Sequence, residues 1–158
     1  MSGTVNLIEL REGGTQDLTE VSRIMADAFD PRFGEAWTSA QCMGMLSLPG
    51  VWLVIAALDG GDVGFALARS TGEEAELLLL ATRPAARCRG VAGALLRATI
   101  AEAQARGVAQ LHLEVRSGND AVRLYRREGF EKVGERKNYY RGKMGQAFDA
   151  HTYSRELG

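Results

Sequence analysis

Apolar residues recur at helical spacing near the start of the chain. Residues 15–17 are typical of a helix start, and an apolar stripe follows at intervals of one to four residues. The stripe consists of Leu18, Val21, Ile24, Met25 and Phe29. Pro31 ends this predicted helix, because the residue before a proline avoids the helical conformation. A short strand is predicted at residues 6–10, and a weaker helical pattern covers residues 37–46.

Apolar and β-branched runs predict three strands in the next part of the chain. Residues 51–57 and 63–69 flank the turn Asp59-Gly60-Gly61-Asp62, which predicts a hairpin. Residues 76–82 form a third run, which Pro84 ends.

Helices and strands alternate in the second half. The clearest helix covers residues 90–105, with an apolar face and Gly107 beyond its end. Strict alternation predicts a strand at residues 109–116. The remaining elements are a short helix from Asn119 or Asp120 to about Glu128 and strands at residues 130–136 and 147–153. This order predicts an α+β fold, a mixed sheet with helices on its faces, in a single domain over residues 1–158.

The composition narrows the possible functions. A chain of 158 residues with 46% hydrophobic and 25% charged residues is typical of one globular domain. The net charge of -1 gives no general attraction to nucleic acid or to anionic membranes. Cys42 and Cys88 are too few and too distant for a disulfide framework, and with two histidines no metal site is expected. No secretory signal or membrane-length apolar run is present, so a cytoplasmic protein is predicted.

The strongest chemical signal lies where the strand at residues 76–82 ends and the helix at residues 90–105 begins. The first N–H groups of a helix have no internal partner, and small residues let an anion approach them. Arg87 and Arg89 add positive charge to this loop. The loop therefore predicts a pyrophosphate cradle, although a solvated loop and helix cap would look the same. It lacks the Gly-Lys-Ser/Thr ending of a P-loop and the spacing of a dinucleotide fingerprint.

The sequence of this loop resembles a known family. Arg87-x-x-Gly90-x-Ala92 resembles the Q/R-x-x-G-x-G/A coenzyme-A loop of the GNAT superfamily of N-acetyltransferases. Other segments similar to the family's core are Leu113-Glu114-Val115-Arg116 with Asn119, Leu124-Tyr125 and Gly129-Phe130. Asn138-Tyr139-Tyr140 and the polar loop after it resemble the branch that acetylates the N-terminal alanine of bacterial ribosomal proteins, the RimI branch. The resemblance covers about residues 62–157.

The resemblance implies a twisted mixed sheet that splays between two central parallel strands, with acetyl-CoA as co-substrate in the gap. Leu80 and Thr82 would pair through their backbones with the pantetheine arm. Arg87 would flank the pyrophosphate, and Asn119 would contact the pantetheine end. The residues that would wrap the pyrophosphate are Cys88, Arg89, Gly90, Val91, Ala92 and Gly93.

The resemblance also implies a catalytic pair that acts by direct transfer in a ternary complex. Glu114 matches the general base, which removes a proton from the attacking amine. Tyr125 matches the general acid, which protonates the leaving thiolate. From the residues alone, Glu114 is more typical of a solvated strand position and Tyr125 of a core position. The interval from Asn119 to Tyr125 is six residues, one shorter than the family usually has.

The acceptor is less well defined than the acetyl donor. Phe33, Trp37, Tyr139 and Tyr140 would either line an acceptor groove or pack in the core. The RimI-like ending implies a protein N-terminus as acceptor, such as an alanine of a small-subunit ribosomal protein. The alternatives are a small-molecule amine, such as a polyamine or an antibiotic, and a non-catalytic acyl-CoA-binding protein. No nucleic-acid or membrane partner is expected, and the oligomeric state stays open.

Overall fold

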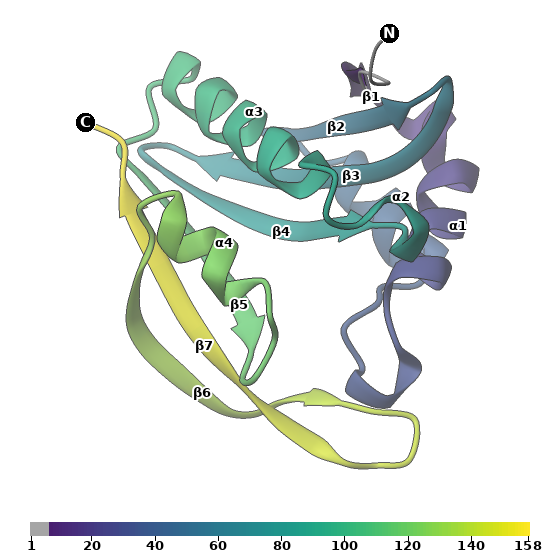
Figure 1. Ribbon diagram of the computed structural model, residues 1–158. Helices are drawn as coiled ribbons and strands as arrows, with labels where there is room; N and C mark the ends of the chain where they lie inside the picture. Colours follow the sequence, from purple (N-terminus) through teal and green to yellow (C-terminus); the bar gives the residue numbers. More distant parts are fainter. Residues whose placement is uncertain (1–6) are drawn as a thin grey trace, which may run out of the picture.

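The computed structural model describes residues 7–158, whose strands form one seven-stranded mixed sheet (Figure 1). The strand order is β1-β2-β3-β4-β5-β7-β6, with β4 and β5 parallel and the other neighbours antiparallel. The strands are β1 (Ile8–Gly13), β2 (Val51–Leu58), β3 (Gly61–Thr71), β4 (Glu74–Thr82), β5 (Gln110–Arg116), β6 (Glu131–Arg141) and β7 (Ala147–Glu156). The helices are α1 (Leu18–Ala28), α2 (Ser39–Leu46), α3 (Val91–Ala105) and α4 (Val122–Arg127), with short 3₁₀ turns η1 (Thr15–Asp17), η2 (Pro31–Phe33) and η3 (Pro84–Ala86).

The parallel pair β4 and β5 stays together over only four residue pairs. Residues 74–77 pair with residues 110–113, and beyond them the two strands diverge, as Figure 1 shows. Strand β4 has a bulge where it separates from β5. The bulge is seen in the register with β3, which shifts there and leaves Leu78 without a partner in the pairing. Leu77 therefore packs in the core on one face of the sheet and Leu79 in the core on the other. The predicted α+β sheet, splayed between its two central parallel strands, is confirmed.

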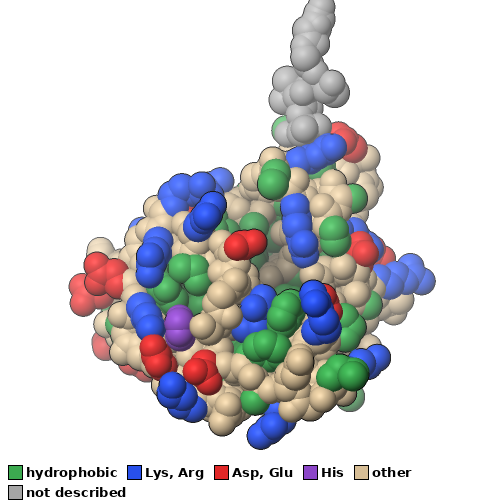
Figure 2. Space-filling view, turned by 60° about the horizontal axis from the view of Figure 1, so that its bottom comes forward, with side chains coloured by type: hydrophobic (Ala, Val, Ile, Leu, Met, Phe, Trp, Pro, Cys, Tyr) green, Lys and Arg blue, Asp and Glu red, His purple; other side chains and the backbone are tan. Residues whose placement is uncertain are grey.

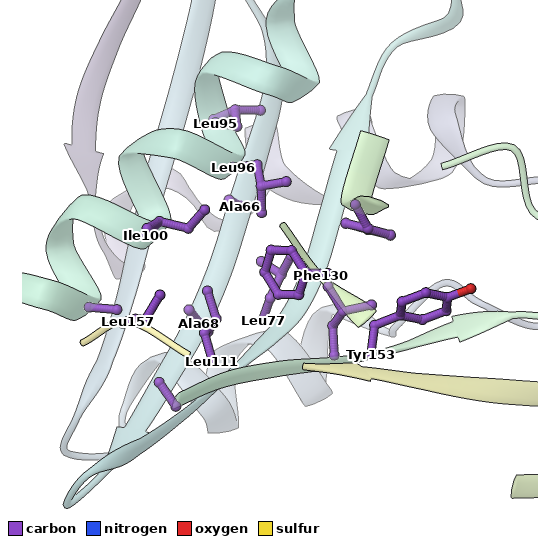
Figure 3. Packing of buried hydrophobic residues seen from close by; sticks show 14 of the residues in the cluster. Ala66, Ala68, Leu77, Leu95, Leu96, Ile100, Leu111, Phe130, Tyr153 and Leu157 are labelled. Carbon is purple, nitrogen blue, oxygen red and sulfur yellow. The ribbon is translucent and has the colours of Figure 1, made fainter. Parts of the chain in front are cut away.

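Helices cover both faces of the sheet. Helix α3 lies on one face, where Figure 3 shows Leu95, Leu96 and Ile100 directed toward the strands. Helices α1 and α2 cover the other face over β2, β3 and β4, where Ile24 is fully buried. Even α3 has only 15 residues, and none of the helices within residues 7–158 has the length and hydropathy to cross a membrane.

Several element boundaries differ from the predicted ones. Strand β6 continues through residues 138–140 to Arg141, because cross-strand pairing with β7 resumes at Tyr140 after an irregular stretch. Helix α2 begins at Ser39 rather than at Trp37, because the Thr38 side chain caps it. Of the strand predicted at residues 6–10, residue 6 lies outside the described part of the chain.

Candidate active site

The loop between β4 and α3 presents the open end of a helix. Gly90 is the N-cap residue of α3 and has φ +84°, a left-handed conformation that favours glycine. No side chain within residues 7–158 caps this end, so the first N–H groups of α3 remain available to an anion. Val91 as a whole is only 1% exposed, so a ligand at this end would meet mainly its neighbours.

The basic residues of this loop differ in their contacts. The Arg87 guanidinium donates a hydrogen bond to the Ala28 carbonyl oxygen at 2.7 Å, which ties the loop to the end of α1. The side chains of Cys88 and Arg89 are exposed, and Cys88 has a φ of +63°. Arg87 therefore anchors the loop, while Arg89 is exposed to an approaching ligand.

Helix α3 reaches across to α4 one turn beyond this loop. An added Cβ on Gly93 would lie 3.1 Å from Nη1 of Arg97, so the guanidinium of Arg97 lies over Gly93. The same nitrogen of Arg97 lies 3.3 Å from a carboxylate oxygen of Glu128, which follows α4. Gly93 thus lies beneath the Arg97 side chain that makes this contact, and Ala92 before it is half-buried.

The end of β4 carries a buried polar atom without a partner. The hydroxyl oxygen of Thr82 is inaccessible to solvent and has no hydrogen-bond partner among residues 7–158. Buried polar atoms are rarely left unpaired, and an oxygen-rich ligand beside β4 would satisfy this one. Leu80 lies on the stretch of β4 that has already separated from β5, and its side chain packs against the core under α3. The donor groups at this end therefore fit a ligand that carries phosphate and amide oxygens.

Glu114 lies near the end of β5, on the strand face opposite the core residues Leu113 and Val115. Its side chain is 7% exposed, so it is not a solvated strand residue. One carboxylate oxygen lies 3.0 Å from Nε of Arg136, and the other accepts a hydrogen bond from the Thr152 hydroxyl at 2.7 Å. These two contacts fix the orientation of the carboxylate.

Tyr125 lies on α4 beside the separated strands. Its ring is 7% exposed and makes an edge contact with Phe130 at 6.0 Å between centroids. Burial raises the pKa of the Tyr125 phenol well above its ordinary value, and the negative charge of Glu35 raises it further. Tyr125 therefore keeps its proton near neutral pH.

Glu35, in the loop between α1 and α2, carries no motif in the sequence but is central to this site. Its carboxylate accepts a hydrogen bond from Asn119 Nδ2 at 3.0 Å and lies 3.4 Å from Nε of Arg116. Asn119 is 84 positions away along the chain, so no local pattern in the sequence brings the two together. Instead of standing free for a ligand, the Asn119 amide connects this loop to α4.

The same loop meets the tip of the β6–β7 hairpin, and Figure 1 shows the two segments side by side. The Lys143 backbone N–H donates to the Pro31 carbonyl oxygen at 3.2 Å. Gly34 has φ +67°, and an added Cβ there would overlap the backbone carbonyl of Arg141. We call this contact between residues 30–34 and 141–143 the bridge. It joins the two segments that flank the open end of the splayed strands.

Phe33 contributes packing to the bridge. Its ring makes an edge contact with Phe148 of β7 at 5.2 Å, and the Arg116 guanidinium lies 3.7 Å from its centroid on another side.

Figure 2, which brings the bottom of Figure 1 forward, shows a hollow in the middle of that face of the molecule, with basic and acidic side chains on its rim.

The three other aromatic residues considered for an acceptor groove differ in where they lie: one packs in the core and two lie near Glu114. Trp37 packs in the core under α1, and its backbone N–H points to the sulfur of Met25 at 3.1 Å, so it is a packing residue. Tyr140 donates its hydroxyl to the Glu114 backbone oxygen at 3.2 Å. Tyr139 is 48% exposed and makes an edge contact with Tyr140 at 4.9 Å. The two tyrosines therefore lie beside Glu114, as an acceptor-lining role requires.

Comparisons with known proteins show which family the chain resembles. Residues 49–132 match the family model described as the acetyltransferase (GNAT) domain. The N-alpha-acetyltransferase RimI of Mycobacterium tuberculosis is 36% identical over 129 residues, which is 78% of each chain. The ribosomal protein bS18-alanine N-acetyltransferase of Haemophilus ducreyi is 44% identical over 79 residues, and the match spans 49% of this chain and 54% of that protein, about half its length. The crystal structure of the ribosomal-protein-S18-alanine N-acetyltransferase from Escherichia coli superposes with a TM-score of 0.85 at 28% identity, over 96% of this chain and 95% of that one.

Proposed function

The chain belongs to the GNAT family of acetyltransferases, and we propose that it transfers an acetyl group from acetyl-CoA to a protein N-terminal α-amino group. We propose further that it acts as a single domain in the cytoplasm. The observation that carries the proposal is the arrangement at the open end of β4 and β5, where the Tyr140 hydroxyl donates to the backbone oxygen of Glu114 and Tyr125 lies on the adjacent α4. Tyr140 bonds Glu114, and the pKa of Tyr140 is raised mainly by burial and also by its neighbours Glu35 and Tyr125, which supports one shared site.

Acetyl-CoA would lie along the separated part of β4. The open N–H groups of α3 and the exposed Arg89 would hold the pyrophosphate, and the backbone at Leu80 and Thr82 would hold the pantetheine arm. The unpaired Thr82 hydroxyl supports this placement, because a polar oxygen of the co-substrate would satisfy it. Arg87 would contribute by fixing the loop against the end of α1.

The chemistry would be a direct transfer. The amine nitrogen forms a bond to the acetyl carbonyl carbon while the bond from that carbon to sulfur breaks. Glu114, directly or through a water, receives the proton that the amine loses. Tyr125, kept protonated by burial, donates its proton to the leaving sulfur. A general acid or base contributes about 10² to 10⁴ in rate, so each residue has a measurable role.

The bridge supports a chain end as the acceptor. It connects the loop before α2 to the hairpin that carries Tyr140, so an amine that approaches Glu114 from this side would pass close to connected backbone. We expect these segments to obstruct a lysine in the middle of a folded surface more than a chain terminus or a small amine. The carboxylates of Glu35 and Glu114 are both paired with arginines, which weakens the attraction for a polyamine. Relatives named ribosomal protein bS18-alanine N-acetyltransferase point the same way.

An acceptor panel tests the proposal. The purified protein would be incubated with acetyl-CoA and either N-terminal peptides or small amines, and free CoA thiol would be followed, with Glu114→Gln and Tyr125→Phe alongside. Turnover on a peptide that begins with alanine, lost in both variants, is expected. Turnover on small amines alone would keep the chemistry but reject the protein acceptor. Acetyl-CoA binding without any turnover would indicate a non-catalytic binding protein.

A further inference from the structure

A chain of contacts runs from the acceptor-side loop to the residue proposed as the acid. Glu35 in that loop accepts a hydrogen bond from Asn119 Nδ2 at 3.0 Å and pairs with Arg116 at 3.4 Å. Asn119 Oδ1 accepts a hydrogen bond from the Ala121 N–H at 2.8 Å. The Tyr125 N–H donates to the Ala121 carbonyl oxygen at 3.1 Å, which forms the first turn of α4. Three consecutive hydrogen bonds thus connect Glu35 to the backbone of Tyr125.

These contacts are sheltered. The side chains of Glu35 and Arg116 are 11% and 14% exposed, so their pairing is screened less by water than a surface ion pair. Arg116 is also held from another side by the ring of Phe33, 3.7 Å from its guanidinium carbon. A hydrogen bond to an ionised carboxylate is stronger than one between neutral groups, which favours a fixed Asn119.

The splayed sheet leaves the position of α4 dependent on contacts such as these. The half that carries β4 and the half that carries β5 pair over only four residue pairs, at the end remote from Glu35. Helix α4 has six residues and cannot hold its own orientation without tertiary contacts. Its N-terminal end is therefore placed largely by the loop that precedes it and by what holds that loop.

We propose that Glu35 is a positioning residue, which joins the acceptor loop to α4 through Asn119 and so places the Tyr125 hydroxyl for proton donation. The proposal rests on the proposed function, because it takes Tyr125 as the acid. The charge of Glu35 also acts on Tyr125 directly, since it adds to the rise in the pKa of that phenol caused mainly by burial. A mutation at Glu35 would therefore impair proton donation to the leaving thiolate, although Glu35 itself would not contact acetyl-CoA.

A mutant cycle tests this route. Glu35→Ala is expected to lower kcat about tenfold, whereas in a Tyr125→Phe background it should change kcat less than about twofold, because residues that act through one another are not additive. Glu35→Gln keeps an oxygen for Asn119 and should restore most of the rate. The control Glu102→Gln removes a more exposed ion pair with Arg106, 3.1 Å long, on α3 and should leave kcat unchanged. An equal loss of kcat in both backgrounds would overturn the proposal.

Amide hydrogen exchange provides a readout that needs no turnover. Glu35→Ala should speed exchange at the Tyr125 amide and the rest of α4 while α3 keeps its protection, because local opening reports local contacts. Unchanged exchange in α4, or an equal increase in α3, would contradict a positioning role. If the unmodified protein acetylates no acceptor, the proposed function fails, yet the exchange result still decides whether Glu35 fixes α4.

Discussion

The two sides of the splayed strands are built in different ways. The side proposed to hold acetyl-CoA comes from one continuous stretch, residues 80–128, in which β4, the loop, α3, β5 and α4 follow one another. The acceptor side joins residues 30–37 to residues 138–152, which meet only because the hairpin folds back onto the loop between α1 and α2. A continuous segment can carry its chemistry as a motif, whereas a site made of distant segments depends on the fold.

This difference implies that the two sides can be damaged separately. The contacts that hold the bridge join residues 30–34 to residues 141–148, so acetyl-CoA binding should survive its loss. Tyr125 and Glu35 connect the two sides. Glu114 does so as well, through its contacts with Tyr140 and Thr152. The following changes separate these cases.

The largest effect is expected at Tyr125, where both sides meet. Tyr125→Phe should lower kcat about 100-fold, because the leaving thiolate loses its proton donor, while acetyl-CoA affinity by calorimetry stays within about twofold. Burial raises the pKa of Tyr125, so its proton is retained as pH rises, and kcat should not fall between about pH 8 and about pH 10, the ordinary tyrosine value. A decline in that interval that Tyr125→Phe abolishes would contradict the assignment.

A change confined to the bridge comes next. Gly34→Ala places a Cβ against the Arg141 carbonyl at a positive φ, so the free energy of unfolding should fall by about 2 kcal/mol. The KM for an acceptor peptide should rise while the Kd for acetyl-CoA is kept. Gly145→Ala is the matched control, because Gly145 also has a positive φ but nothing lies within 4 Å of its added Cβ. Equal effects of both variants on the acceptor KM would show that the bridge does not influence acceptor binding.

A change at Arg87, which holds the loop before α3 against the end of α1, should affect acetyl-CoA binding and not acceptor binding. Arg87→Met removes the hydrogen bond to Ala28 and a positive charge, so the Kd for acetyl-CoA should rise about fivefold, equivalent to about 1 kcal/mol. The acceptor KM should not change. Arg23→Met on the surface of α1 is the control, since Arg23 is exposed and pairs only loosely with Glu20 at 3.7 Å. A larger effect on the acceptor than on acetyl-CoA would reverse the assignment of the two sides.

The smallest effect is a change in thiol reactivity. Cys88 is exposed in the loop that would hold the pyrophosphate, whereas Cys42 is fully buried and burial raises the pKa of its thiol. A thiol reagent should therefore label Cys88 alone, and CoA should slow that labelling. Equal labelling rates with and without CoA would place the phosphates elsewhere.

Sequence patterns predicted the fold further than they predicted the site. The apolar periodicity of α1 and α3 and the alternation in β5 follow from burial of one face, so those elements were predicted closely. The contacts of Glu35, Gly34 and Tyr140 were not predicted, because they depend on which distant segments meet. Gly34 has the sequence signature of any loop glycine, and only its approach to a carbonyl in β6 shows why a side chain would not fit.

Trp37 is a residue whose role the sequence could not decide. Its aromatic ring suited an acceptor groove as well as a core, and the choice depended on the position of α1. By contrast, Gly90 and Arg87 needed only their immediate neighbours to indicate a helix start that can receive an anion.

The central claim is that the acetyl group goes to a chain terminus. The most direct measurement uses a peptide with a free N-terminal alanine and an internal lysine, incubated with acetyl-CoA and the protein and then sequenced by tandem mass spectrometry. The account predicts acetylation of the alanine α-amine alone, at a rate that Gly34→Ala reduces. Acetylation of the lysine side chain at a comparable rate would show that the bridge does not restrict the acceptor and would contradict the account.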